Sequence, residues 1–96
     1  MVYATVGDTI RLNAAFKAFD GTGTDPTTVT LTVYDELRNI ILTAGTSAGG
    51  VENGSTDGAY LYDYLTLNEG VHFYEFEGTL ETHTISDKGT FYVTFA

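Results

Sequence analysis

A short segment flanked by glycines is the part of the sequence that most resembles an enzyme motif. Gly45-Thr46-Ser47-Ala48-Gly49 matches the G-x-S-x-G pattern of a serine nucleophile. That nucleophile works from a strained turn between a strand and a helix, and no helix is expected after Ser47. A chain of 96 residues is also too short for the parallel sheet that supports it. We therefore expect a loop here, and a protein that is not an enzyme.

Carboxylates and histidines could also transfer protons or bind a metal ion. Glu75 and Glu77 share an outward strand face, whereas paired catalytic carboxylates must face each other across a cleft. His72 and His83 are the only histidines, and without cysteine they make a weak zinc set. The aspartates that could share Ca²⁺ between loops are Asp8, Asp20, Asp25, Asp57, Asp63 and Asp87. Because aspartates in turns also bond to their own backbone, the sequence assigns no catalytic, metal or cofactor site.

Outward aromatic side chains could bind another molecule. Tyr34, Phe73 and Tyr92 alternate with residues expected in the core. Exposed aromatic residues are enriched in protein interfaces and can stack on sugar rings, but they also pair across strands within one sheet. A glycine-rich loop over residues 44–58 adds Ser47 and Val51. These five residues are the interface candidates.

The elements that must position these residues are short strands, because apolar and polar residues alternate with a period of two. Seven or eight strands recur with turn signals between them, which is typical of an antiparallel β-sandwich or barrel. The expected strands are Val2–Val6, Thr9–Phe16, Thr28–Tyr34, Asn39–Thr43, a strand beginning at Gly58–Tyr64, Val71–Glu77, Thr79–Ile85 and Thr90–Phe95. The expected inward residues include Ile10, Leu12, Ala14, Phe16, Val29, Leu31, Val33, the tyrosines of 58–64, His72, Tyr74, Phe76, Phe91, Val93 and Phe95.

Composition limits the class of partner. The 96 residues predict a single domain over 1–96, with a net charge of −9 and a pI near 4.2. This charge disfavours nucleic acid and anionic membranes, because basic side chains must replace the counterions of either one. No disulfide can form without cysteine, and no apolar run approaches the ~20 residues of a membrane-spanning helix. The first residues also lack the pattern of a signal peptide.

Two segments resemble immunoglobulin domains. Gly7-Asp8-Thr9-Ile10-Arg11-Leu12-Asn13-Ala14 is similar to the run into their B strand, and Asn68-Glu69-Gly70-Val71-His72-Phe73-Tyr74 to the run into their F strand. The resemblance places Ala14 and Tyr74 at the two half-cystine positions. It places His72 at the corner tyrosine, and Leu31 or Val33 at the core tryptophan. It implies an all-β, immunoglobulin-like antiparallel sandwich of seven or eight strands.

The wider layout, over roughly residues 6–95, resembles the immunoglobulin-like domains of structural proteins of tailed bacteriophages. The residues that carry this resemblance are Gly7-Asp8-Thr9-Ile10, Asp20-Gly21-Thr22, Asp25-Pro26, the glycine-rich loop, Asp57-Gly58 and Glu69-Gly70. It implies a non-enzymatic virion protein, either a capsid decoration or a head–neck component. Its partners would be the major capsid protein, other virion proteins, or copies of itself in a homo-oligomer. The alternative is a carbohydrate- or host-cell-surface-binding module, located outside the cell or on its surface.

Overall fold

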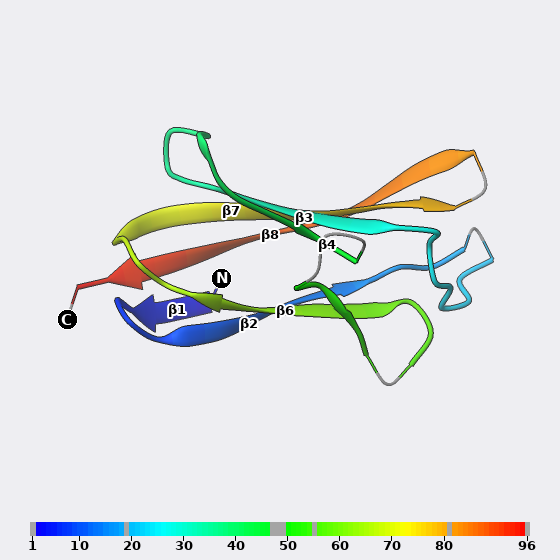
Figure 1. Ribbon diagram of the computed structural model, residues 1–96, viewed down its shortest axis with the longest axis horizontal. Coiled ribbons are helices and arrows are strands. Elements are labelled where there is room, and N and C mark those ends of the chain that lie inside the picture. The colour runs from blue at the N-terminus through cyan, green and yellow to red at the C-terminus, as the bar shows by residue number, and fades with distance from the viewer. Residues whose placement is uncertain (1, 19, 47–49, 55, 81, 96) are drawn as a thin grey trace.

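The computed structural model describes residues 2–18, 20–46, 50–54, 56–80 and 82–95, which form two packed β-sheets (Figure 1). The strands are β1 (Val2–Thr5), β2 (Thr9–Ala15), β3 (Val29–Tyr34), β4 (Ile40–Gly45), β5 (Glu52–Asn53), β6 (Ala59–Leu65), β7 (Gly70–Leu80) and β8 (His83–Thr94). One sheet has the order β1-β8-β7-β3-β4, and the other has the order β2-β6-β5. The predicted all-β, immunoglobulin-like sandwich is confirmed.

Neighbouring strands pair antiparallel, except that β1 runs parallel to β8. The longest ladder is the β7–β8 hairpin, which pairs from Gly70 with Val93 to Leu80 with His83. The prediction of a separate strand over Thr79–Ile85 is therefore wrong. This segment holds the end of β7 and the start of β8, and its alternating pattern belongs to two strands rather than one.

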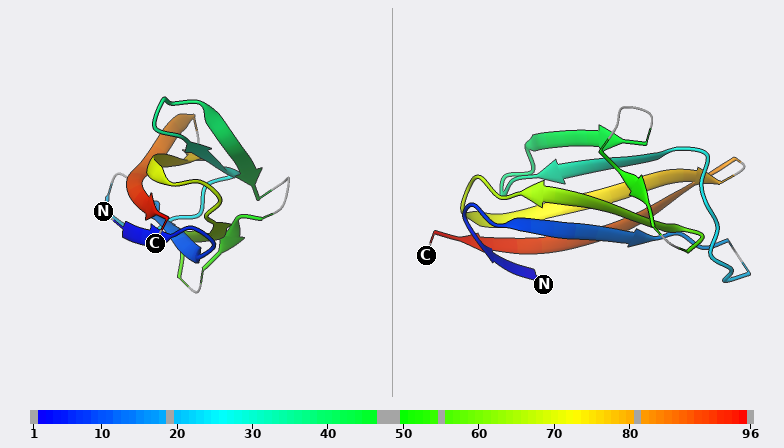
Figure 2. Two further views of the ribbon diagram at one scale, coloured as in Figure 1. Left: turned by 90° about the vertical axis from the view of Figure 1, so that its left-hand side faces the viewer. Right: turned by 60° about the horizontal axis from the view of Figure 1, so that its bottom comes forward.

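The core lies between the two layers of strands, and the left-hand view in Figure 2 shows these layers end-on. The largest fully buried side chains are Phe16, Phe76 and Phe91. Each fully buried side chain of this size contributes about 1.5–3 kcal/mol relative to an exposed one. The inward residues predicted for β2, β3, β6 and β7 are all buried or packed against the core. Phe95 is the exception: it is 76% exposed because β8 ends at Thr94.

The positions that distinguish immunoglobulin domains are filled differently here. Ala14 is buried, and the Tyr74 ring packs edge-on against Phe76 and tilted against Phe91. His72 is also buried; its ring lies parallel to Phe91, with centroids 4.9 Å apart, and its Nδ1 is 3.0 Å from the carbonyl oxygen of Gly70. Leu31 and Val33 are buried as well, so apolar and aromatic side chains take the positions that the resemblance matched to the disulfide and the tryptophan of antibody domains.

The glycine-rich loop is partly built into the sandwich. Gly45 and Gly50 form an isolated bridge, and β5 pairs with β6. Val51 is buried in the core, so its assignment as an interface residue is wrong; an apolar side chain between two bridged segments packs inward. Ser47 lies outside the described residues. The loop ends at Gly58, whose φ of 85° lies in the region that favours glycine.

Candidate functional site

Several of the residues first considered for catalysis or metal binding make structural contacts. Glu75 pairs with Lys88, with its Oε2 3.4 Å from the Lys88 Nζ, and Glu77 is exposed on the same face. The His72 ring packs in the core. In the part of the chain that the structure describes, no three histidine, aspartate or glutamate side chains are grouped to hold a metal ion. The same part contains no helix able to cross a membrane.

The turn aspartates bond mainly to backbone amides. Asp35 Oδ1 accepts hydrogen bonds from the amides of Leu37 and Asn39, and Asp20 Oδ1 accepts one from Thr22. The Thr22 amide lowers the pKa of Asp20, and the Asn39 amide lowers that of Asp35. These carboxylates therefore bond to the backbone of their own turns, which is one of the two interpretations that the sequence allowed.

Asp25 ties the loop of residues 44–58 to the preceding turn. Its Oδ1 accepts hydrogen bonds from the Gly58 amide at 2.7 Å and the Asn53 side-chain amide at 3.0 Å. These two bonds, that of Gly58 first, lower the pKa of Asp25. The lowered pKa means that the charged carboxylate favours the folded state.

We expect Asp25→Ala to reduce stability in a pH-dependent way. The folded-state pKa lies below the unfolded value of about 3.9, so the contribution of Asp25 is complete above about pH 4 and is lost as pH falls through the folded pKa. Thermal melts should therefore show the wild type more stable than the variant at pH 7, with the difference closing on acidification. Asp25→Asn keeps an oxygen acceptor without the charge and serves as control. A difference that grew on acidification would contradict this role.

The outer face of the five-stranded sheet, turned away from the core, carries a band of apolar and aromatic side chains. The register places Ile40 beside Tyr34, and Tyr34 beside Phe73. It also places Val71, on the same strand as Phe73, beside Tyr92 of β8, and Tyr92 beside Tyr3 of β1. The band crosses all five strands and consists of Tyr3, Tyr34, Ile40, Val71, Phe73 and Tyr92. The rest of this face is polar; it carries Thr30, Thr32, Thr43, Glu75, Glu77, Ser86 and Lys88.

The side chains of this apolar band differ in exposure. Tyr3 is 73% exposed and Ile40 is 64% exposed, whereas Tyr34 and Phe73 are half-buried by their neighbours. The Tyr3 and Tyr92 rings lie 6.1 Å apart and are inclined by 57°. Three of the five predicted interface residues, Tyr34, Phe73 and Tyr92, are therefore brought together on one face.

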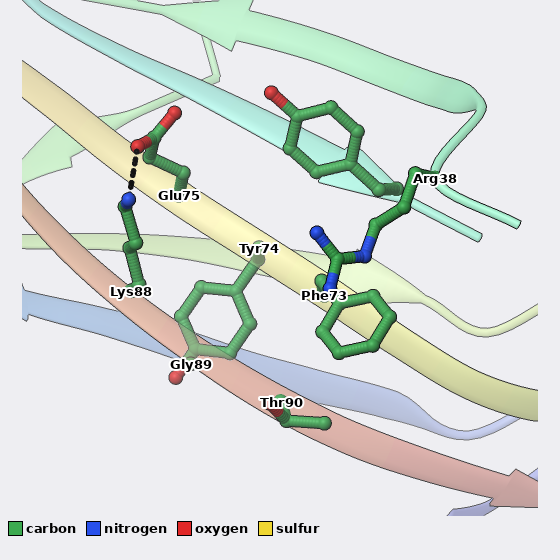
Figure 3. A pocket seen from close by; sticks show the side chains of 8 residues that line it. Arg38, Phe73, Tyr74, Glu75, Lys88, Gly89 and Thr90 are labelled. Atoms are coloured by element: carbon green, nitrogen blue, oxygen red, sulfur yellow. Dashed lines mark ion pairs between the residues drawn. The ribbon is translucent and has the colours of Figure 1, made fainter. Parts of the chain in front are cut away.

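A hollow of about 490 Å³ lies next to the apolar band (Figure 3). It is lined by Tyr34, Arg38, Phe73, Tyr74, Glu75, Lys88, Gly89 and Thr90. The Arg38 guanidinium carbon lies 4.4 Å from the centre of the Phe73 ring, in a cation–π contact. Arg38, Lys88, Ile40 and Tyr3 were missed as site residues. The sequence signal that could have indicated Arg38 is its place directly before Asn39 in the turn between two predicted strands, where glycine or asparagine is more common than arginine.

The end of the sandwich beside the band also exposes apolar residues. The β3–β4 turn, the β6–β7 connection and the end of β8 lie together at this end (Figure 1). The exposed residues in or next to these segments are Leu37, Ile41, Leu65, Leu67 and Phe95. A smaller hollow here is lined by residues that include Asp35, Glu36 and Glu69, which place negative charge at the margin of the band.

Comparison with known proteins gives a likeness in fold. No known protein family matches the sequence, and no curated protein matches it. Among solved structures, CopC from Methylosinus trichosporium OB3b superimposes with a TM-score of 0.64 at 14% identity. The match covers 98% of this chain and 85% of CopC. At this identity the likeness concerns the β-sandwich alone.

This comparison overturns the expectation of a phage structural protein. That expectation depended on a layout of turn residues and strands, and the same layout fits a domain with the fold of CopC, which is not a phage structural protein. Turn residues and alternation are set by the sandwich and are shared by domains with unrelated functions. The capsid decoration and head–neck assignments are therefore wrong, and the virion proteins predicted as partners lose their support with them.

Proposed function

We propose that this chain is a non-enzymatic protein-binding module, and that its partner docks on the outer face of the five-stranded sheet. The observation that carries the proposal is the apolar band, which crosses all five strands beside a polar remainder. Interfaces combine such an apolar and aromatic centre with a polar rim. Tyrosine is among the residues that dominate binding energy when a partner buries them.

The charge of the chain favours a basic partner. A net charge of −9 repels a second copy over long range and attracts a positively charged protein. Asp35, Glu36 and Glu69 place acidic groups at one margin of the band, where lysine or arginine residues of a partner could pair with them. We accordingly propose a different protein, rather than a second copy, as the partner.

The ring geometry favours a protein over a glycan. A sugar ring stacks on an open aromatic face, but the guanidinium of Arg38 covers one face of Phe73. Tyr3 and Tyr92 are inclined to each other by 57° and do not form a flat platform. Rings inclined in this way suit an uneven surface of protein side chains.

A photo-crosslinking experiment tests the docking face. A benzoylphenylalanine at Tyr92 should crosslink a basic protein in extracts of the source organism, whereas the same group at exposed Asn13 on the three-stranded sheet should not. The protein captured is then purified, and its binding is measured directly. Crosslinking from Asn13 alone would place the interface on the opposite sheet and overturn the proposal.

With the purified partner, we expect Tyr34→Ser and Tyr92→Ser each to weaken binding by about tenfold or more, as for buried interface tyrosines. Neither substitution should unfold the monomer, because both side chains lie outside the core. Asn13→Ser is the matched control and should leave the affinity unchanged. Unchanged affinity in both tyrosine variants, or a stable dimer of the free chain in sedimentation velocity, would contradict the proposal.

A further inference from the structure

The backbone at Arg38 has a conformation that arginine rarely adopts. Its φ is 69°, and it is the one residue other than glycine with a positive φ in the part of the chain that the structure describes. In turns between paired strands, a positive φ is usually adopted by glycine or asparagine, because other side chains are strained there. An arginine held in this conformation points to a role for its side chain.

Hydrogen bonds around Asp35 fix the backbone of the turn at Arg38. Asp35 Oδ1 accepts from the Leu37 amide at 2.9 Å and from the Asn39 amide at 2.8 Å. The Arg38 amide donates to the Asp35 carbonyl at 3.0 Å, and the Asp35 amide donates to the Asn39 carbonyl at 2.9 Å. The backbone from which the arginine side chain extends is therefore fixed relative to the sheet.

The guanidinium is oriented by Phe73 but is left with unused donors. Its carbon lies 4.4 Å from the ring centre, so the cation–π contact uses a face of the aromatic ring (Figure 3). Among the described residues, no side chain or carbonyl accepts a hydrogen bond from this guanidinium. A guanidinium carries five N–H donors in a fork that matches a carboxylate, and these donors border the hollow.

The charge of the hollow contrasts with that of the whole chain. Only four basic residues exist, and two of them, Arg38 and Lys88, line this hollow. Glu75 is its one acidic lining residue, and it pairs with Lys88 at 3.4 Å. Together the three side chains leave one net positive charge, which matches a singly charged anion better than a doubly charged one.

We propose that this hollow is a carboxylate-binding subsite in which Arg38, held over Phe73, forms a paired hydrogen bond with a carboxylate, while the ion pair of Lys88 and Glu75 borders the subsite. The inference deepens the proposed function and rests on it for the source of the carboxylate, which is an aspartate or glutamate side chain of the docked partner. The acidic net charge attracts a basic protein over long range. The subsite then fixes the register of the complex through one acidic side chain.

The test is an NMR titration of the ¹⁵N-labelled full chain with N-acetyl-glutamate N-methylamide, whose only charge is the side-chain carboxylate. The Arg38 Nε–H and the amides of Phe73 and Thr90 should shift with a Kd in about the millimolar range, and added salt should weaken binding. The glutamine analogue, which is neutral and nearly the same shape, should produce no shifts. Equal shifts with both probes, or tighter binding of inorganic phosphate, would overturn the assignment.

Two variants separate binding from packing. Arg38→Gly should fold at least as well as the wild type, because glycine adopts the positive φ freely, but it should lose about tenfold or more in affinity for the probe. Arg11→Gln on the other sheet removes an arginine that pairs with Asp63 and should leave probe binding unchanged. A large loss of thermal stability in Arg38→Gly, or unchanged probe affinity, would show that Arg38 is retained for packing and overturn the proposal.

The titration and the crosslinking experiment fail independently. The probe binds the pure chain, so absent probe shifts combined with crosslinking from Tyr92 would remove the subsite and keep the docking face. Probe binding without any crosslinking from the outer face would keep the subsite but remove the protein partner as the source of the carboxylate.

Discussion

Phe91→Ala is expected to lower the free energy of unfolding by about 3–5 kcal/mol, as for other buried phenylalanines. Phe91 is fully buried, and its ring contacts His72, Tyr64 and Tyr74 at centroid distances of 4.9, 5.6 and 6.1 Å. Removal of the ring would leave a cavity between the sheets and take away the stacking partner of a buried histidine. The total free energy of unfolding of a domain of this size is about 5–15 kcal/mol. Thermal unfolding should therefore shift down by roughly 12–40 °C.

The neighbouring residue provides the control for Phe91. Tyr92 points to the outer face, so Tyr92→Ala removes a ring of similar size without opening the core. We expect this change to lower stability by about 1 kcal/mol or less. If both variants melted together near the wild-type temperature, the burial assigned to Phe91 would be incorrect.

Gly58→Ala is expected to have the second-largest effect, at about 2–5 kcal/mol. A Cβ at this position would overlap the carbonyl oxygen of Phe16 and lie 2.9 Å from the amide nitrogen of Thr24. Alanine at a φ of 85° lowers the free energy of unfolding by about 1–2 kcal/mol through conformational strain. The backbone shift needed to make room for the Cβ lowers it by about 1–3 kcal/mol more. The shift would also disturb the hydrogen bond between the Phe16 amide and the Gly58 carbonyl. Denaturant unfolding of the variant measures the combined loss.

Gly21→Ala separates the two causes. Gly21 has a similar φ of 88°, but a Cβ there would meet nothing within 4 Å. This variant should therefore show the conformational strain alone, at about 1–2 kcal/mol. Equal losses at both positions would mean that the close approach of the backbone at Gly58 contributes nothing.

The sequence predicted the layers of the sandwich because a strand with one buried face must alternate. Leu12, Val33 and Phe76 were placed in the core from this pattern alone, and all three are buried. The pattern does not report where one strand stops and the next begins. The β7–β8 hairpin therefore looked like an extra strand over Thr79–Ile85, and Phe95 looked like one more inward position.

The candidate site was only partly predictable from the sequence. Alternation placed Tyr34, Phe73 and Tyr92 outward, but only the pairing register brings Tyr34 beside Phe73 and Glu75 beside Lys88. The contact between Arg38 and Phe73 joins a turn to a strand that follows it by more than 30 residues, and no local pattern encodes such a contact. Val51 was misplaced because a glycine-rich segment has no period from which burial can be inferred.

The parallel pairing of the first and last strands has a mechanical consequence. Val2 lies opposite Phe91, and Thr5 lies opposite Thr94, so the strand near one terminus runs alongside the strand that leads to the other. Tension that pulls the start of β1 away from the end of β8 would slide these strands lengthwise past each other. The hydrogen bonds between them would then be loaded in shear and would have to break together, rather than one after another from an end. The fold therefore resists stretching along its termini more than peeling of its edges.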